Sequence, residues 1–261
     1  MRFSSKTQFT PTSKAKTSKT QKNSVTLDRA FSKLGIFSRT DALKKIVAGS
    51  VTVNGRVVCN PDTWVSLSRD KIRYDGQIVR KQKKVYLMFY KPKGVVTTYR
   101  DPGHRKTVYD YLSGLKEWVF PVGRLDKDTS GLLILTNDTQ FGEALTNPLS
   151  KISKTYQVKV NFHLSAEQVQ LLEQGITLKN GEKTLPSRVR IIRYTEKYTY
   201  LDMVIFEGKN RQIRRMIEAL DGHVLKLVRK RIGNLGLGDL QVGQLRYLDD
   251  RDLIQLQRSS W

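Results

Sequence analysis

The chain has 261 residues, of which 47 are Lys or Arg and 24 are Asp or Glu, so its formal net charge is +23. This excess indicates a polyanionic partner, because a basic surface attracts phosphate backbones without reading their sequence. Hydrophobic residues make up 38% of the chain, which suffices for one large domain or two smaller ones. No apolar run approaches the roughly 18 residues of a membrane span, and we expect no membrane partner.

A single cysteine, Cys59, excludes intramolecular disulfides and thiolate metal clusters and indicates a reducing compartment such as the cytoplasm. The three histidines, His104, His163 and His223, lack the spacing of metal ligands. The chain also carries no phosphate-binding glycine loop and no dinucleotide fingerprint. We therefore expect neither a metal nor a cofactor.

Residues 1–23 contain scattered lysines among Ser, Thr and Gln, and the first acidic residue of the chain is Asp28. Such a segment cannot bury enough apolar surface to fold alone. It predicts a disordered basic arm that lies along nucleic acid, with an organelle transit peptide as the alternative.

Residues 24–82 predict a small α/β module. Apolar residues recur at helical spacing from Val25 and end at Gly35, and a second helix is predicted from Ser38, with Asp41 at capping-box spacing, to Gly49. The pair Asn54-Gly55 between two valine-rich runs predicts a hairpin with a type I′ turn. Strands are expected near residues 71–74 and 78.

Basic residues lie off the apolar stripes of this module. Their positions beside a tight hairpin suit contact with a folded RNA backbone, although a solvated helix face is the alternative. The candidates are Arg39, Lys44, Lys45 and Arg56. The segments 37–39, 42–46 and 51–58, with Gly49, resemble the S-four-like RNA-binding domain. The resemblance implies structured RNA as the ligand and leaves the reaction open.

Residues 83–261 predict a larger domain. Strand-like runs occur at 85–90, 119–122, 132–135, 156–160, 189–192 and 200–206, and helical patterns at 141–145, 166–174 and 210–220. This mixture predicts an α+β fold with a mostly antiparallel sheet and flanking helices.

Four segments of the larger domain resemble, in order and spacing, the pseudouridine synthases typified by small ribosomal subunit pseudouridine synthase A. They are residues 90–94, 123–138, 154–156 and 207–216. The resemblance implies a pseudouridine synthase domain that isomerises uridine within ribosomal RNA. That reaction needs no cofactor.

The resemblance also implies roles for three residues. Asp126 is the essential acid, which either attacks the anomeric carbon or withdraws a ribose proton, and both roles require an ionised carboxylate. Tyr156 stacks on the everted uridine, because a base cannot turn inside a helix. Arg214 pairs with Asp126 and offsets the cost of burying its charge.

Arg211, Arg214 and Arg215 are spaced to share one face of the predicted helix, opposite an apolar stripe. We expect this face to clamp phosphate or carboxylate groups, with Arg211 and Arg215 on RNA phosphates. Arg124 and Lys154 are further candidates for RNA contact. A local salt bridge is the alternative for Arg124, and simple solvation is the alternative for Lys154.

Two other functions remain open at this point. The chain could be a catalytically silent RNA-binding ribosome-assembly factor. A glycosidase acting on RNA would need a second carboxylate, and Asp128 is too turn-like for that role. The stretches 101–103 and 107–110 resemble the large-subunit members of that family more than the small-subunit one, and this resemblance favours large-subunit ribosomal RNA as the substrate. A monomer in a bacterial cytoplasm is the expected setting.

Overall fold

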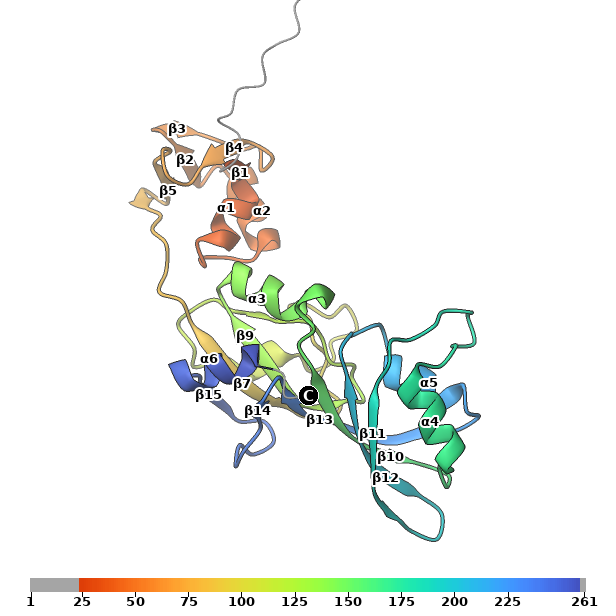
Figure 1. Cartoon of the computed structure of the whole chain (residues 1–261). Coiled ribbons are helices and arrows are strands. Elements are labelled where there is room, and N and C mark those ends of the chain that lie inside the picture. Colours follow the sequence, from red (N-terminus) through yellow and green to blue (C-terminus); the bar gives the residue numbers. More distant parts are fainter. Residues whose placement is uncertain (1–23, 259–261) are drawn as a thin grey trace, which may run out of the picture.

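The computed structural model describes residues 24–258. It shows a small N-terminal module, residues 24–82, next to a larger body, residues 83–258 (Figure 1). The basic arm expected at residues 1–23 lies outside the described residues. The exact domain boundary near residue 82 stays a prediction.

Two helices of the N-terminal module pack against short strands. The helices are α1 (Leu27–Lys33) and α2 (Arg39–Val47). A four-stranded sheet has the order β3-β2-β5-β6, and β1 pairs with β4. These strands are β1 (Ser24–Thr26), β2 (Val51–Val53), β3 (Arg56–Val57), β4 (Trp64–Ser66), β5 (Ile72–Tyr74) and β6 (Gln77–Ile78).

Two local signals in this module act as the sequence predicts, whereas Val25, expected to begin the first helix, lies in strand β1. The Ser38 side chain accepts a hydrogen bond from the Asp41 backbone N–H and so caps α2. Asn54 and Gly55 both have positive φ, 52° and 84°, as a type I′ turn requires. The apolar faces of both helices meet the sheet in a core that includes Leu27, Phe31 and Ile46.

The larger body is built on one nine-stranded sheet with the order β11-β12-β10-β13-β9-β7-β15, to which β14 and β8 add. All pairs are antiparallel except β13 with β9. The predicted α+β class with a mostly antiparallel sheet is therefore confirmed. The strands are β7 (Tyr86–Lys91), β8 (Phe120–Pro121), β9 (Ser130–Thr136), β10 (Lys154–Val160), β11 (Arg188–Tyr194), β12 (Thr199–Ile205), β13 (Val224–Ile232), β14 (Leu235–Gly236) and β15 (Leu245–Tyr247).

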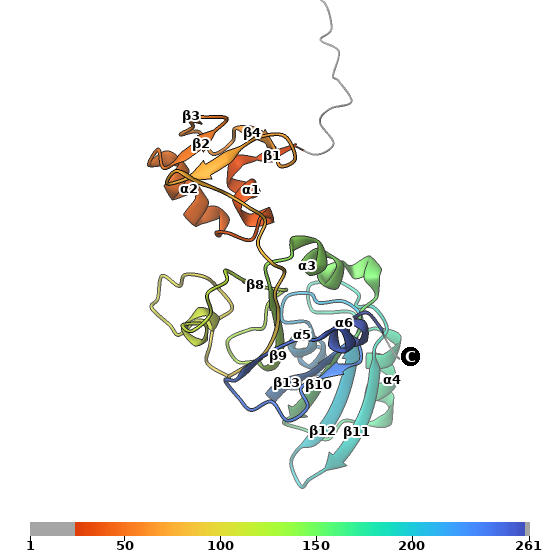
Figure 2. The ribbon, with the colours of Figure 1, turned by 90° about the vertical axis from the view of Figure 1, so that its left-hand side faces the viewer.

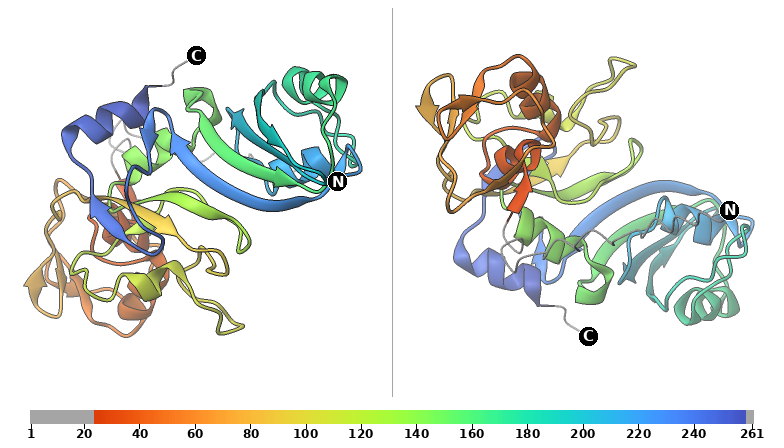
Figure 3. Two further views of the ribbon diagram at one scale, coloured as in Figure 1. Left: turned by 90° about the horizontal axis from the view of Figure 1, so that it is seen from below. Right: turned by 90° about the horizontal axis from the view of Figure 1, so that it is seen from above.

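Helices cover the two halves of this sheet separately, and the long strands β10 and β13 run between the halves (Figure 3). The first half is covered by α4 (Ala166–Gln174) and α5 (Gln212–Glu218), whose apolar residues join those of β10 and β12 in one core. The second half packs against α3 (Thr139–Thr146) and α6 (Asp250–Gln257). Two 3-10 turns complete the body, Val108–Tyr111 and Pro148–Ser150.

The sequence missed part of this sheet. Strand β13 was not expected, because four cationic residues, Lys226, Arg229, Lys230 and Arg231, interrupt its apolar residues. The strand nevertheless lies in the middle of the sheet, between β10 and β9. Helix α5 also begins at Gln212, two residues later than its apolar pattern indicated.

The N-terminal module and the body lie on either side of the linker near residue 82 (Figure 2), and polar contacts hold this linker. The Asn137 side chain donates to the Lys83 carbonyl at 2.8 Å and accepts from the Val85 N–H at 2.9 Å. The backbone N–H of Gln82 donates to the Leu34 carbonyl at the end of α1. One asparagine of the body therefore holds the linker where it leaves the module.

A glycine at the parallel pair sets how closely β9 approaches β13. Gly131 has φ +115°, and a Cβ there would lie 2.2 Å from the carbonyl oxygen of Arg229. We expect Gly131→Ala to lower the free energy of unfolding by about 2 to 6 kcal/mol, combining backbone strain with overpacking. Urea denaturation measures the change. Gly181→Ala is the matched control, because it has φ +83° but an open surrounding. Equal losses in both variants would contradict the role of the close approach.

Candidate active site

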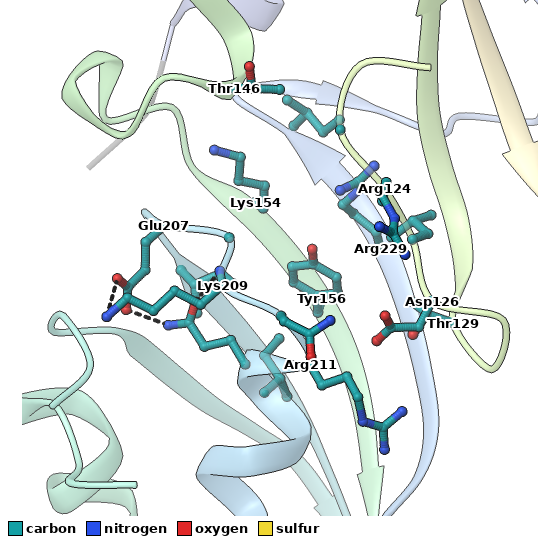
Figure 4. Close-up of a pocket in the computed structure, with 18 of the residues that line it drawn as sticks. Arg124, Asp126, Thr129, Thr146, Lys154, Tyr156, Glu207, Lys209, Arg211 and Arg229 are labelled. Carbon is teal, nitrogen blue, oxygen red and sulfur yellow. Dashed lines mark hydrogen bonds and ion pairs between the residues drawn. The ribbon is translucent and has the colours of Figure 1, made fainter. Parts of the chain in front are cut away.

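A cavity of about 620 Å³ lies between the β8–β9 loop, strands β10 and β13, and the segment before α5 (Figure 4). It brings together residues that are distant in the sequence. Five of the predicted site residues line it, together with one that the sequence did not indicate. They are Arg124, Asp126, Lys154, Tyr156 and Arg211, joined by Arg229.

The loop that carries Asp126 is held by its backbone. The carbonyl oxygen of Asp126 accepts from the Thr129 N–H at 3.0 Å, which closes a turn just before β9. The Lys127 carbonyl accepts from the Gly94 N–H at 2.8 Å. These bonds use main-chain groups, so the Asp126 carboxylate is left to line the cavity.

Tyr156 lies in β10 with its side chain on the buried face of the strand. Its register partners are Met203 on β12 and Arg229 on β13. Only 9% of the residue is exposed, and its ring lies in the cavity between the Asp126 loop and the segment that carries Lys209 (Figure 4). Tyr156 and Asp126 thus line the same cavity, while the stacking of Tyr156 on an everted base stays a prediction.

Arg214 is a buried residue of α5 whose side chain reaches the backbone of the Asp126 loop. Its guanidinium donates to the carbonyl of Asp128 at 3.0 Å and to that of Val224 at 3.1 Å. Burial and the nearby Arg211 lower the pKa of Arg214, and the Asp126 and Asp128 carboxylates partly offset this. Arg214 therefore fixes the loop two residues beyond Asp126, while a direct ion pair between Arg214 and Asp126 stays a prediction.

The expected common face of three arginines is wrong. Arg211 has φ +49° and stands before the first residue of α5, so its side chain leaves the helical register and is exposed beside the cavity. Arg214 is buried, and Arg215 forms an ion pair with Glu182 at 3.2 Å. Of the three, only Arg211 lines the cavity.

Salt bridges stiffen the segment that forms the opposite wall. Lys209 contacts Glu182 at 2.7 Å and the buried Glu207 at 3.3 Å. The Gln212 side chain donates to Glu207 at 2.6 Å (Figure 4). These contacts fix the turn from which Arg211 projects.

Arg229 is the residue that sequence reasoning missed. It is 6% exposed, and its Nε donates to the Leu132 carbonyl at 2.7 Å. One terminal nitrogen is buried and has no hydrogen-bond partner among the described residues. Leaving a buried guanidinium nitrogen without a partner costs free energy, and such an exception marks Arg229 as a candidate functional residue of the cavity. A strand assignment for 224–232 would have been the signal that revealed it.

Two lysines lie at or near the cavity: Lys154 is partly buried in its lining, and Lys91 is fully buried near Asp126. Burial, together with the charge of Arg229, lowers the pKa of Lys154 to about 8. Lys91 is fully buried at the end of β7, and burial lowers its pKa to about 8 despite the nearby Asp126 and Asp128 carboxylates. Its ammonium donates to the carbonyls of Pro92 and Val95, so Lys91 braces the backbone beside the loop.

The four basic candidates of the N-terminal module differ in their surroundings. Arg39 pairs with Asp28 at 2.7 Å. The Lys45 ammonium donates to the Tyr74 hydroxyl at 2.6 Å and lies over the rings of Phe37 and Tyr74. Lys44 on α2 and Arg56 on β3 are exposed to solvent. Contact of any of the four with RNA stays a prediction.

Within residues 24–258, no group of three or more His, Cys, Asp and Glu side chains is arranged to hold a metal ion. No helix in the same range combines the length and the apolar character needed to cross a bilayer. The chemistry available at the cavity is that of one loop carboxylate, one buried tyrosine and several cations.

Comparison with known proteins identifies the family to which this chain belongs. The profile of the RNA pseudouridylate synthase family matches residues 85–219. The chain is 38% identical over 233 residues to ribosomal large subunit pseudouridine synthase B of Bacillus subtilis, a match that covers 88% of this chain and 95% of that protein. It is 36% identical to an uncharacterized RNA pseudouridine synthase of Aquifex aeolicus, with 89% and 93% covered. A crystal structure of a pseudouridylate synthase matches with a TM-score of 0.64 and 29% identity, covering 89% of this chain and 99% of that one. This chain therefore belongs to the RNA pseudouridylate synthase family.

Proposed function

We propose that the chain isomerises uridine to pseudouridine at a specific position in ribosomal RNA, and that the substrate is large-subunit RNA. The observation that carries the proposal is that Asp126 and a buried tyrosine, Tyr156, line one cavity together with several cations. The choice of subunit is supported by the 38% identity to a protein named for large-subunit RNA.

The reaction rearranges bonds within one nucleotide. The bond from C1′ of the ribose to N1 of uracil breaks, the base turns, and C1′ bonds to C5, which gives up its proton as N1 gains one. Ionised Asp126 either forms a temporary ester at C1′ or removes the C2′ proton to leave a glycal. Both routes regenerate the carboxylate, so no oxidant, metal or phosphoryl donor is consumed.

The target uridine must leave the RNA stack to reach Asp126. The cavity volume of about 620 Å³ is in the range of small-molecule sites and accommodates one nucleoside. The Tyr156 ring offers a flat surface on which an everted base can stack. The cations Arg124, Lys154, Arg211 and Arg229 are placed to receive the flanking phosphates or the uracil carbonyls.

We further propose that the N-terminal module is an S-four-like domain that binds structured RNA. Its exposed Lys44 and Arg56 are the best placed of its candidates, because Arg39 and Lys45 already have partners within the module. A monomer acting in the bacterial cytoplasm is the simplest setting, and the free, exposed Cys59 is compatible with a reducing compartment.

Substitution of Asp126 tests the assignment. We expect Asp126→Asn to reduce pseudouridine formation on large-subunit RNA transcripts by about a thousandfold or more, because an amide neither attacks C1′ nor accepts a ribose proton. RNA affinity should change by less than about threefold, since backbone bonds hold the loop. Mapping of pseudouridine by carbodiimide modification and primer extension measures the product, and filter binding measures the affinity.

Asp128→Asn is the matched control for that variant. Asp128 is exposed in the same loop, and its bond to Arg214 uses the main-chain carbonyl, which the substitution preserves. Its activity should stay within about threefold of wild type. If the wild-type protein binds ribosomal RNA but forms no pseudouridine in it, the chain is a silent assembly factor instead.

Lys154 gives the RNA affinity a dependence on pH. Its pKa is lowered to about 8, so the ammonium is charged below that pH and loses its charge above it. If Lys154 contacts a phosphate, the affinity of wild type should fall about threefold to tenfold more than that of Lys154→Arg between about pH 7 and about pH 9. Fluorescence anisotropy with a labelled RNA hairpin measures this difference. Parallel pH curves would show that Lys154 makes no such contact.

A further inference from the structure

The catalytic loop has a side-chain contact immediately before Asp126. The Thr97 hydroxyl donates to the carbonyl oxygen of Leu125 at 2.8 Å and accepts from the N–H of the same residue at 3.3 Å. One hydroxyl thus pairs both main-chain groups of Leu125, as a neighbouring strand would. The other contacts of this loop, from Gly94 and Arg214, act after Asp126.

Thr97 is itself held firmly enough to restrain a loop. Its neighbour Val96 pairs with the segment at Thr107: the Val96 N–H donates to the Lys106 carbonyl, and the Val96 carbonyl accepts from the Val108 N–H. The preceding residue, Val95, is 3% exposed and packs in the large core. The hydroxyl of Thr97 therefore projects from a fixed backbone.

The position of Leu125 decides where the Asp126 carboxylate points. Leu125 is 4% exposed and packs in the core, and the next residue, Asp126, lines the cavity. Because the two residues share a peptide bond, fixing the backbone of Leu125 restricts the direction in which the Asp126 side chain leaves the chain. We propose that Thr97 is a positioning residue for this reaction, which holds Asp126 against the substrate sugar by fixing the backbone of Leu125. The proposal rests on the proposed function.

The chain offers a conservative series and a matched control. Thr97→Val keeps the shape and removes both hydrogen bonds, and Thr97→Ser restores the hydroxyl. Thr98→Val is the control, because the Thr98 hydroxyl donates to the Arg100 carbonyl and not to the catalytic loop. In single turnovers on large-subunit RNA, we expect Thr97→Val to lower the rate constant by about tenfold to a hundredfold with RNA affinity within about threefold. Thr97→Ser and Thr98→Val should stay within about threefold of wild type.

Hydrogen–deuterium exchange provides a readout that does not depend on activity. A peptide covering residues 123–129 should exchange faster in Thr97→Val than in wild type, Thr97→Ser or Thr98→Val. A wild-type rate in Thr97→Val, or a slow rate without faster exchange, would overturn the proposal. Failure of Thr97→Ser to recover the rate would overturn it too. If wild type forms no pseudouridine, the proposed function fails, and the exchange pattern alone then decides whether Thr97 holds the loop.

Discussion

The site depends on fixing a loop through its backbone while leaving one carboxylate without a structural task. Main-chain bonds from Gly94 and Thr129, together with the Arg214 guanidinium on the Asp128 carbonyl, hold residues 126–128. If the Asp126 carboxylate itself capped the turn, its oxygens would be engaged and aimed at amides. Because the turn is closed by the carbonyl of Asp126, the acid is available for chemistry and its direction is set in advance, which lowers the cost of orienting it in each reaction cycle.

The second constraint is electrostatic. Arginines and lysines outnumber carboxylates around the cavity, and the buried glutamate on its wall, Glu207, is already engaged by Lys209 and Gln212. This excess of positive charge attracts phosphate groups to the cavity. The same crowding of cations, added to burial, lowers the pKa of Lys154. The cations around the cavity therefore have two effects: Arg229 adds to the lowering of the pKa of Lys154, and together they attract anionic groups.

Elements marked by strong local sequence signals could be predicted from the sequence, and elements without such signals could not. Helix α2 has a serine cap and a clear apolar stripe, and Asn54-Gly55 demands a type I′ turn, so both followed from the sequence. The central strand β13 did not, because its exposed cations mask the alternation of apolar and polar residues. Since the strand was missed, the position of Arg229 at the cavity was missed too. The three arginines near α5 were misplaced for a different reason: a left-handed residue, Arg211, shifts the start of the helix, and helical spacing cannot reveal such a backbone turn. Asp126 and Tyr156 were found because short motifs of the family carry them.

The N-terminal module is tied to the body at places that bear on the same loop. The Asp41 carboxylate on α2 lies 3.7 Å from the Arg100 guanidinium. It also accepts a hydrogen bond from the Tyr99 hydroxyl, which raises the pKa of Tyr99. Both contacts lie within three residues of Thr97, whose hydroxyl pairs with Leu125, next to Asp126. The first turn of α2 and the Asp126 loop are thus connected through one short, well-held segment, residues 97–100. The N-terminal module and the Asp126 loop therefore contact the two ends of the same piece of chain.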